Sequence, residues 1–141
     1  MRILVELHGG KSNCTADYNM VGIDTDEMKI YDFDFLKVRS INKTEIFNTE
    51  PDNIIPLKKE WSLSNGTDTI TYKDINEENL RHIKSVMLKA DNIKDKQYMN
   101  IYIINGNSVE LVYDERALNN LDTKYRLLVE YIKYLVTYSL D

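Results

Sequence analysis

Cysteine is nearly absent from this chain, since Cys14 is the only one among its 141 residues. An intramolecular disulfide is therefore excluded, which is typical of a protein from a reducing compartment. No run of about 18 apolar residues occurs, so no membrane-spanning helix is expected. The apolar run at the start of the chain ends at Glu6 and is too short for a secretory signal. The sequence thus predicts a cytoplasmic location and no contact with membranes.

An excess of positive charge is also missing, because the formal net charge is −5. Direct binding of nucleic acid is not expected, since it depends on a basic surface. Alanine is scarce, whereas lysine, asparagine, isoleucine, tyrosine and aspartate are plentiful. AT-rich codons produce this bias, which indicates a low-GC bacterium or one of its mobile elements.

The length and the composition are those of an ordinary globular domain. Apolar residues make up 43% of the chain and charged residues 29%. A chain of this length has room for a sizeable core. We therefore expect one domain that covers residues 1–141.

The first half of the chain reads as β-strands. Tyr31, Phe33 and Phe35 alternate with acidic residues, as in a strand with one buried face. After Phe35 the phase of the alternation flips, which indicates a bulge or the end of a strand. Asn48–Pro56, with two prolines, reads as a loop. The expected strands are Met1–Leu7, Tyr18–Ile23, Met28–Val38 and Ile41–Phe47.

Two Asn-Gly pairs predict β-hairpins. The first, Asn65-Gly66, suits a two-residue loop between strands that contain Trp61 and Ile70. The second lies in a hairpin over Tyr98–Tyr113. There a three-residue loop, Asn105–Asn107, with Asn107 in the left-handed conformation, gathers the apolar residues on one face. These residues are Met99, Ile101, Ile103, Val109, Leu111 and Tyr113.

Two helices complete the expected fold. Asp74 and Glu77 form the capping box of a helix that ends near Asp91-Asn92. A C-terminal helix follows Asp114, and its heptad-like apolar seam is Leu118, Leu121, Tyr125, Leu128, Ile132 and Leu135. The predicted fold class is α+β: an antiparallel β-sheet with two hairpins, one middle helix and a long C-terminal helix packed on the sheet.

The segment Gly9–Ser12 resembles the end of a phosphate-binding loop. A Walker A motif needs an earlier glycine, but Val5 stands at that position, and a poor helix start follows Ser12. A plain turn between two strands accounts for both glycines. Lys11 and Ser12 remain candidates for binding a small ligand such as a nucleotide.

The motifs in the sequence predict no enzyme, no metal site and no cofactor. Asp24-Thr25-Asp26 resembles the start of a calcium loop, but Met28 and Lys29 stand where a ligand and a glycine are required. His8, Cys14 and His82 have no spacing that fixes a catalytic triad or a zinc site.

Two groups of residues are candidates for binding a protein partner. The acidic run forms either a solvated strand face and turn or a recognition surface for a basic partner; its members are Asp24, Asp26, Glu27, Asp32 and Asp34. Tyr131, Tyr134 and Tyr138 form a second apolar stripe on the C-terminal helix. This stripe is either core or an interface, and we expect it to support a homodimer.

These features favour a non-enzymatic protein-binding inhibitor. In composition the chain is similar to phage anti-defence proteins, including anti-CRISPR proteins, which block nucleic-acid-binding host enzymes. The alternatives are a small-ligand or nucleotide-binding (sponge) protein and a toxin-immunity protein.

Overall fold

The structure, a computed structural model, describes residues 1–8, 19–56, 75–78, 80–81, 98–114 and 125–139. Two compact units divide the chain. The first consists of Met1–Pro56 with Asp95–Leu121, and the second consists of Leu57–Lys94 with Asp122–Asp141. The single domain over residues 1–141 stays a prediction.

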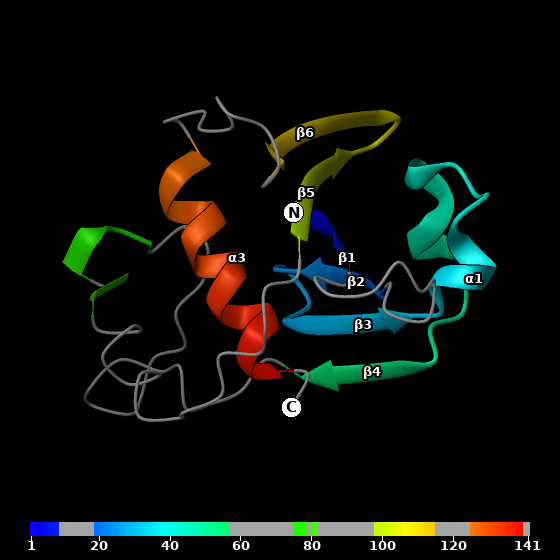
Figure 1. Ribbon diagram of the computed structural model, residues 1–141, viewed down its shortest axis with the longest axis horizontal. Coiled ribbons are helices and arrows are strands. Elements are labelled where there is room, and N and C mark those ends of the chain that lie inside the picture. Colours follow the sequence, from blue (N-terminus) through cyan, green and yellow to red (C-terminus); the bar gives the residue numbers. More distant parts are fainter. Residues whose placement is uncertain (9–18, 57–74, 79, 82–97, 115–124, 140–141) are drawn as a thin grey trace. The chain divides into compact units, whose positions relative to one another are not determined.

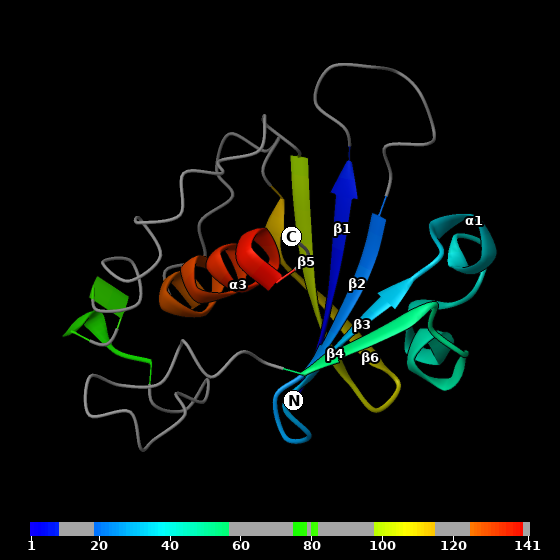
Figure 2. The ribbon, with the colours of Figure 1, turned by 90° about the horizontal axis from the view of Figure 1, so that it is seen from below.

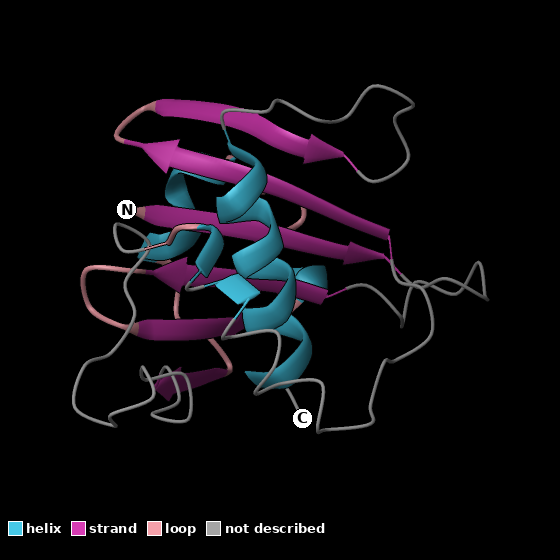
Figure 3. Ribbon diagram, turned by 90° about the vertical axis from the view of Figure 1, so that its left-hand side faces the viewer, coloured by secondary structure: helices cyan, strands magenta, loops and turns pink. Residues whose placement is uncertain are grey.

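The first unit contains an antiparallel sheet of six strands in the order β4-β3-β2-β1-β5-β6 (Figures 1 and 3). With the helices described below, the sheet confirms the α+β class. The strands are β1 (Arg2–His8), β2 (Asn19–Asp24), β3 (Lys29–Phe33), β4 (Asn53–Pro56), β5 (Tyr98–Asn105) and β6 (Ser108–Asp114).

The first two strands lie where the sequence predicts them. Ile3, Leu4 and Val5 of β1, a central strand between β2 and β5, are all buried, so the strand has buried side chains on both of its faces. β1 and β2 pair antiparallel. The predicted turn over Gly9–Ser12 requires this pairing of the flanking strands, although residues 9–18 themselves lie outside the described part.

The third predicted strand, Met28–Val38, is too long, because its second part forms a helix. β3 ends at Phe33, and the short helix α1 (Phe35–Val38) follows. Asp34 causes the change, because its carboxylate accepts the Leu36 N–H at 3.0 Å and caps the helix. Of the two explanations for the flip in phase, the strand end is therefore correct.

The fourth predicted strand, Ile41–Phe47, is wrong. The chain instead forms a 3₁₀ helix, η2 (Lys43–Asn48), which begins where the Asn42 side chain accepts the Thr44 N–H at 3.2 Å. The loop predicted over Asn48–Pro56 is wrong in its second half, because β4 pairs there with β3.

The hairpin of β5 and β6 is confirmed, but its predicted loop is wrong. Asn105 pairs with Ser108, so the loop has two residues, and Gly106, rather than Asn107, has the positive φ of 61°. The two-residue loop pairs Val109 with Ile104 and Leu111 with Tyr102, so the six apolar residues do not share one face as predicted. Val109 and Leu111 therefore lie on the opposite face from Ile101 and Ile103. A bulge between Ile101 and Tyr102 then returns Tyr113 to the face of Ile101.

One face of the sheet carries α1 and η2, as Figure 2 shows, and we call it the helical face. Its buried core consists of Leu4, Met20, Phe33, Val38, Ile46 and Ile104. The opposite face of the sheet is lined by buried apolar side chains as well; they include Ile3, Val5, Val21, Ile23, Ile30 and Ile101.

A glycine on β2 leaves the space into which η2 packs its Phe47 ring. A Cβ at Gly22 would lie 2.8 Å from the Phe47 ring and 2.8 Å from the Phe33 ring. Phe47 therefore fills the space above Gly22, and its ring meets Tyr31 and Phe33 edge-on, with centroids 5.9 Å away in each case. Edge-to-face pairs of this kind add about 0.5–1.5 kcal/mol to the stabilisation from burial.

The second unit contains α3 (Arg126–Ser139) and the start of a middle helix. Glu77, Glu78, Leu80 and Arg81 are helical, and the Leu80 N–H donates to the Asn76 carbonyl at 2.9 Å. The predicted cap Asp74 and the hairpin at Asn65-Gly66 lie outside the described residues. The packing of the C-terminal helix on the sheet stays a prediction.

None of the helices in the described ranges is long and apolar enough to cross a membrane.

We expect Gly22→Ala to lower the free energy of unfolding by about 1–3 kcal/mol, because the added methyl overpacks the two phenylalanine rings. Urea denaturation measures this change. Without a clash, alanine would strengthen a strand relative to glycine. The loss should therefore shrink when Gly22→Ala is made in a Phe47→Ala background. An equal loss in both backgrounds would show that Phe47 does not need the glycine.

Candidate functional site

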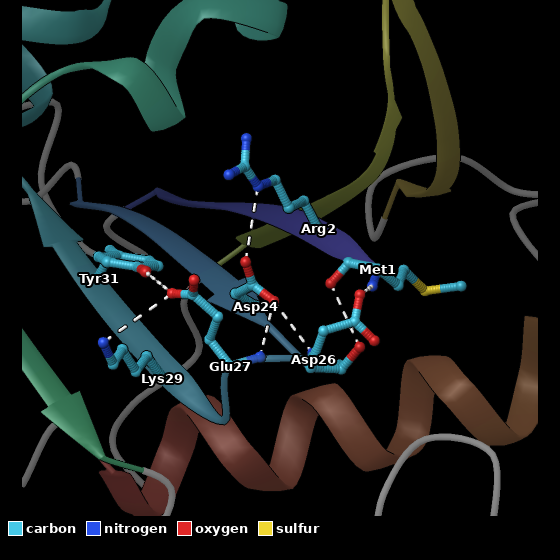
Figure 4. Close-up of polar contacts among 8 residues, drawn as sticks. Met1, Arg2, Asp24, Asp26, Glu27, Lys29 and Tyr31 are labelled. Atoms are coloured by element: carbon cyan, nitrogen blue, oxygen red, sulfur yellow. Dashed lines mark hydrogen bonds and ion pairs between the residues drawn. The ribbon is translucent and has the colours of Figure 1, made fainter.

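The turn between β2 and β3 is the best-defined polar feature of the described chain. Asp24 pairs with Lys29 at the base of the turn, and the four residues Thr25–Met28 form its tip. Asp24 Oδ1 accepts the N–H groups of Asp26 at 3.0 Å and Glu27 at 3.1 Å (Figure 4). The Asp24 side chain is only 8% exposed. Asp24 therefore stabilises the backbone of the turn and offers little surface to a partner.

Met1 and Arg2, at the start of the chain, brace this turn. The Met1 carbonyl accepts the Thr25 N–H at 3.0 Å and the Thr25 hydroxyl at 3.2 Å. The Met1 ammonium lies 2.7 Å from Asp26 Oδ2, and Arg2 Nε lies 3.5 Å from Asp24 Oδ2. Contacts from a neighbouring strand thus hold the backbone of the tip in place.

Asp26 and Glu27 project from the tip, with side chains 72% and 58% exposed. We call these two residues the acidic tip. Glu27 accepts a hydrogen bond from the Tyr31 hydroxyl at 3.1 Å and lies 3.9 Å from Lys29 Nζ. Partial burial, and then the hydrogen bond to the Glu27 carboxylate, raise the pKa of Tyr31. Tyr31 therefore keeps its proton and donates to Glu27.

The other two acidic residues lie apart from the acidic tip. Asp32 pairs with Val21 and Asn53, and it belongs to the face of the sheet opposite Tyr31 and Phe33. Asp34 lies beyond the far end of β3 and caps α1. The structure therefore brings together Asp24, Asp26 and Glu27 but separates Asp32 and Asp34 from them.

Asp32 is held in an unfavourable environment for a carboxylate. Its pKa is raised, first because the side chain is partly buried and then because the charge of Asp52 lies nearby. The Asp52 N–H donates to the Asp32 carbonyl at 2.8 Å, which keeps the two residues adjacent.

The predicted tyrosine stripe is only partly described. Tyr131 is 1% exposed, so this side chain is interior in the chain and not open to a partner. Of the two alternatives for the stripe, this burial favours core at Tyr131, and Val129 and Ile132 beside it are buried too. The side chains of Tyr134 and Tyr138 lie outside the described part, as do Lys11 and Ser12. The homodimer through this helix stays a prediction.

Within the residues that the structure describes, no three His, Cys, Asp or Glu side chains are grouped so that they could hold a metal ion. Comparison with protein-family models, with curated proteins and with solved structures found no match.

Sequence reasoning missed the supporting contacts of Arg2 and Thr25. Arg2 pairs with Asp24 across β1 and β2, and its guanidinium also lies 5.2 Å from the centre of the Phe47 ring. The charges of Arg2 and Asp24 are visible in the sequence. Their proximity depends on the register of two strands that are separated by a long connection.

Met28, the last residue of the turn, has a φ of 55°, which is unfavourable for a residue with a Cβ. We expect Met28→Gly to be more stable than Met28→Ala by about 1 kcal/mol, because both variants lose the side chain but only glycine relieves the strain. Thermal melting of the two variants measures this difference. Equal melting temperatures would contradict a strained residue at this position.

The raised pKa of Asp32 predicts how stability depends on pH. The folded chain favours the protonated carboxyl, so stability falls as the pH rises from the ordinary pKa of aspartate through the raised one. Asp32→Asn removes the ionised form and should raise the melting temperature at pH 7, with little gain at pH 3. Asp34→Asn is the control, since it removes the same charge and keeps a capping oxygen. A similar gain from both variants at pH 7 would argue against this role of Asp32.

Proposed function

We propose that this chain is a non-enzymatic inhibitor that acts in the cytoplasm by binding a basic protein partner through the acidic tip. The observation that carries the proposal is the combination of exposure and bracing at Asp26 and Glu27. Both carboxylates are exposed, while Asp24 and the Met1 carbonyl fix the backbone beneath them. A preorganised loop loses little conformational entropy on binding.

The partner that suits such a surface is a nucleic-acid-binding enzyme. The basic groove of such an enzyme attracts negative charge, which speeds association and selects the partner. The net charge of −5 adds to this attraction. Together with the AT-rich codon bias, these features support an anti-defence role for a phage or mobile element, similar to that of anti-CRISPR proteins.

We expect the double variant Asp26→Lys/Glu27→Lys to lose partner binding by at least about tenfold, because like charges would then oppose each other. The matched control is Glu45→Lys/Glu50→Lys, which changes the net charge by the same amount at two other exposed positions. Each protein is immobilised and exposed to lysate of a low-GC bacterium, and the captured proteins are identified by mass spectrometry.

The captured enzyme is then purified and its nucleic-acid binding is titrated with each variant. The native chain and the control should block nucleic-acid binding when they are present at about the same concentration as the enzyme. Added salt should weaken this inhibition. Equal inhibition by the charge-reversed variant, with an unchanged melting temperature, would refute the acidic tip as the binding surface.

A further inference from the structure

The two outer strands of the sheet differ in how well their edges are protected. β4 has four residues and ends at Pro56, and the Ile54 N–H already donates to Asn53 Oδ1 at 3.0 Å. Short length, proline and a capped N–H all prevent the addition of another strand. β6 has seven residues, and within the described chain no strand pairs with its outer side (Figures 1 and 3).

The backbone of β6 offers hydrogen-bonding groups on this outer side. Asn105 and Ser108 flank a two-residue loop and are therefore a pair whose backbone groups point toward each other. Hydrogen-bonded pairs alternate along an antiparallel ladder, so the backbone groups of Ile103 and Glu110 also point toward each other. It follows that the N–H and C=O groups of Val109 and Leu111 point away from β5.

The side chains at this edge are exposed and apolar on one face. Val109 is 38% exposed and Leu111 is 52% exposed, although both are large hydrophobic residues. They lie on the helical face across from Ile104 and Tyr102, and Lys43 Nζ lies 4.9 Å from the centre of the Tyr102 ring. Glu110, between them, is exposed on the opposite face. The bulge beyond Leu111 ends this regular stretch.

We propose that the outer edge of β6 binds an extended segment of a partner protein, which adds as a seventh, antiparallel strand. Backbone hydrogen bonds to Val109 and Leu111 supply affinity, and alternate side chains supply specificity. The segment carries a lysine or arginine opposite Glu110, flanked by apolar residues opposite Val109 and Leu111. Such pairs directly across two strands contribute about 0.2–1 kcal/mol each.

The charge of Glu110 selects against a second copy of this chain. In the antiparallel register that places Val109 opposite Leu111, Glu110 would lie opposite the same glutamate of the second copy. Like charges directly opposite each other are destabilising in a sheet. This edge lies on β6, whereas the acidic tip joins β2 to β3, so the proposal does not rest on the function proposed above.

The test uses two nine-residue peptides with threonine flanks, one with Val-Lys-Val at its centre and one with Val-Glu-Val. Fluorescence polarisation with the native chain should give saturable binding of the lysine peptide and at least about tenfold weaker binding of the glutamate peptide. Glu110→Lys should reverse this preference. The charge-reversed acidic tip variant should bind the lysine peptide like the native chain.

Leu111→Pro removes an outward N–H and leaves the hydrogen bonds between β5 and β6 in place, because proline is tolerated on the free side of an edge strand. We expect this variant to bind the lysine peptide at least about tenfold more weakly than the native chain does. Ile54→Pro, which alters the protected edge, is the control and should bind like the native chain. Thermal melting confirms that each variant is folded.

Two results would overturn the proposal. One is equal affinity for the two peptides in both the native chain and Glu110→Lys, a comparison that does not depend on the folding of the proline variant. The other is a native dimer in light scattering that dissociates on Leu111→Pro, which would assign this edge to a second copy.

Discussion

The absence of a side chain at Gly22 is the constraint on which the helical face depends. Phe47 occupies the space above this glycine and meets Tyr31 and Phe33 edge-on, so this ring and the buried Ile46 together hold η2 over the sheet. The same ring lies under the Arg2 guanidinium, and Arg2 in turn pairs with Asp24 at the base of the β2–β3 turn. Packing of η2 is thereby linked to the shape of the acidic tip.

Burial divides the acidic run into residues that stabilise the fold and residues that face solvent. Asp24 accepts backbone N–H groups inside its turn, and Asp34 caps α1. Each therefore satisfies donors that would otherwise lack partners. Asp32 is partly buried near Asp52, which costs stability when both are ionised. Asp26 and Glu27 are left as the exposed pair, so a count of acidic residues overstates the available surface.

The sheet carries two candidate contact surfaces with different chemistry. At the β2–β3 turn the exposed groups are carboxylates, whose long-range attraction depends on salt. At the β6 edge they are backbone amides, carbonyls and two apolar side chains, which act only at contact. A partner with a basic surface and an extended segment could use both surfaces. The separate variants assign the contribution of each to affinity.

Local patterns in the sequence determined the α+β class, the first two strands and the β5–β6 hairpin, because alternation and Asn-Gly turns act over a few residues. Tertiary structure decided the rest. Ile41–Phe47 has the apolar content of a strand, but the Asn42 cap and the space above Gly22 make it η2. The two-residue loop places Val109 and Leu111 on the helical face, and the bulge near Val112, which no local signal marks, returns Tyr113 to the face of Ile101. Strand register, which joins residues far apart in the chain, brought Arg2 to Asp24 and placed Val109 and Leu111 on β6, the outer strand of the described sheet.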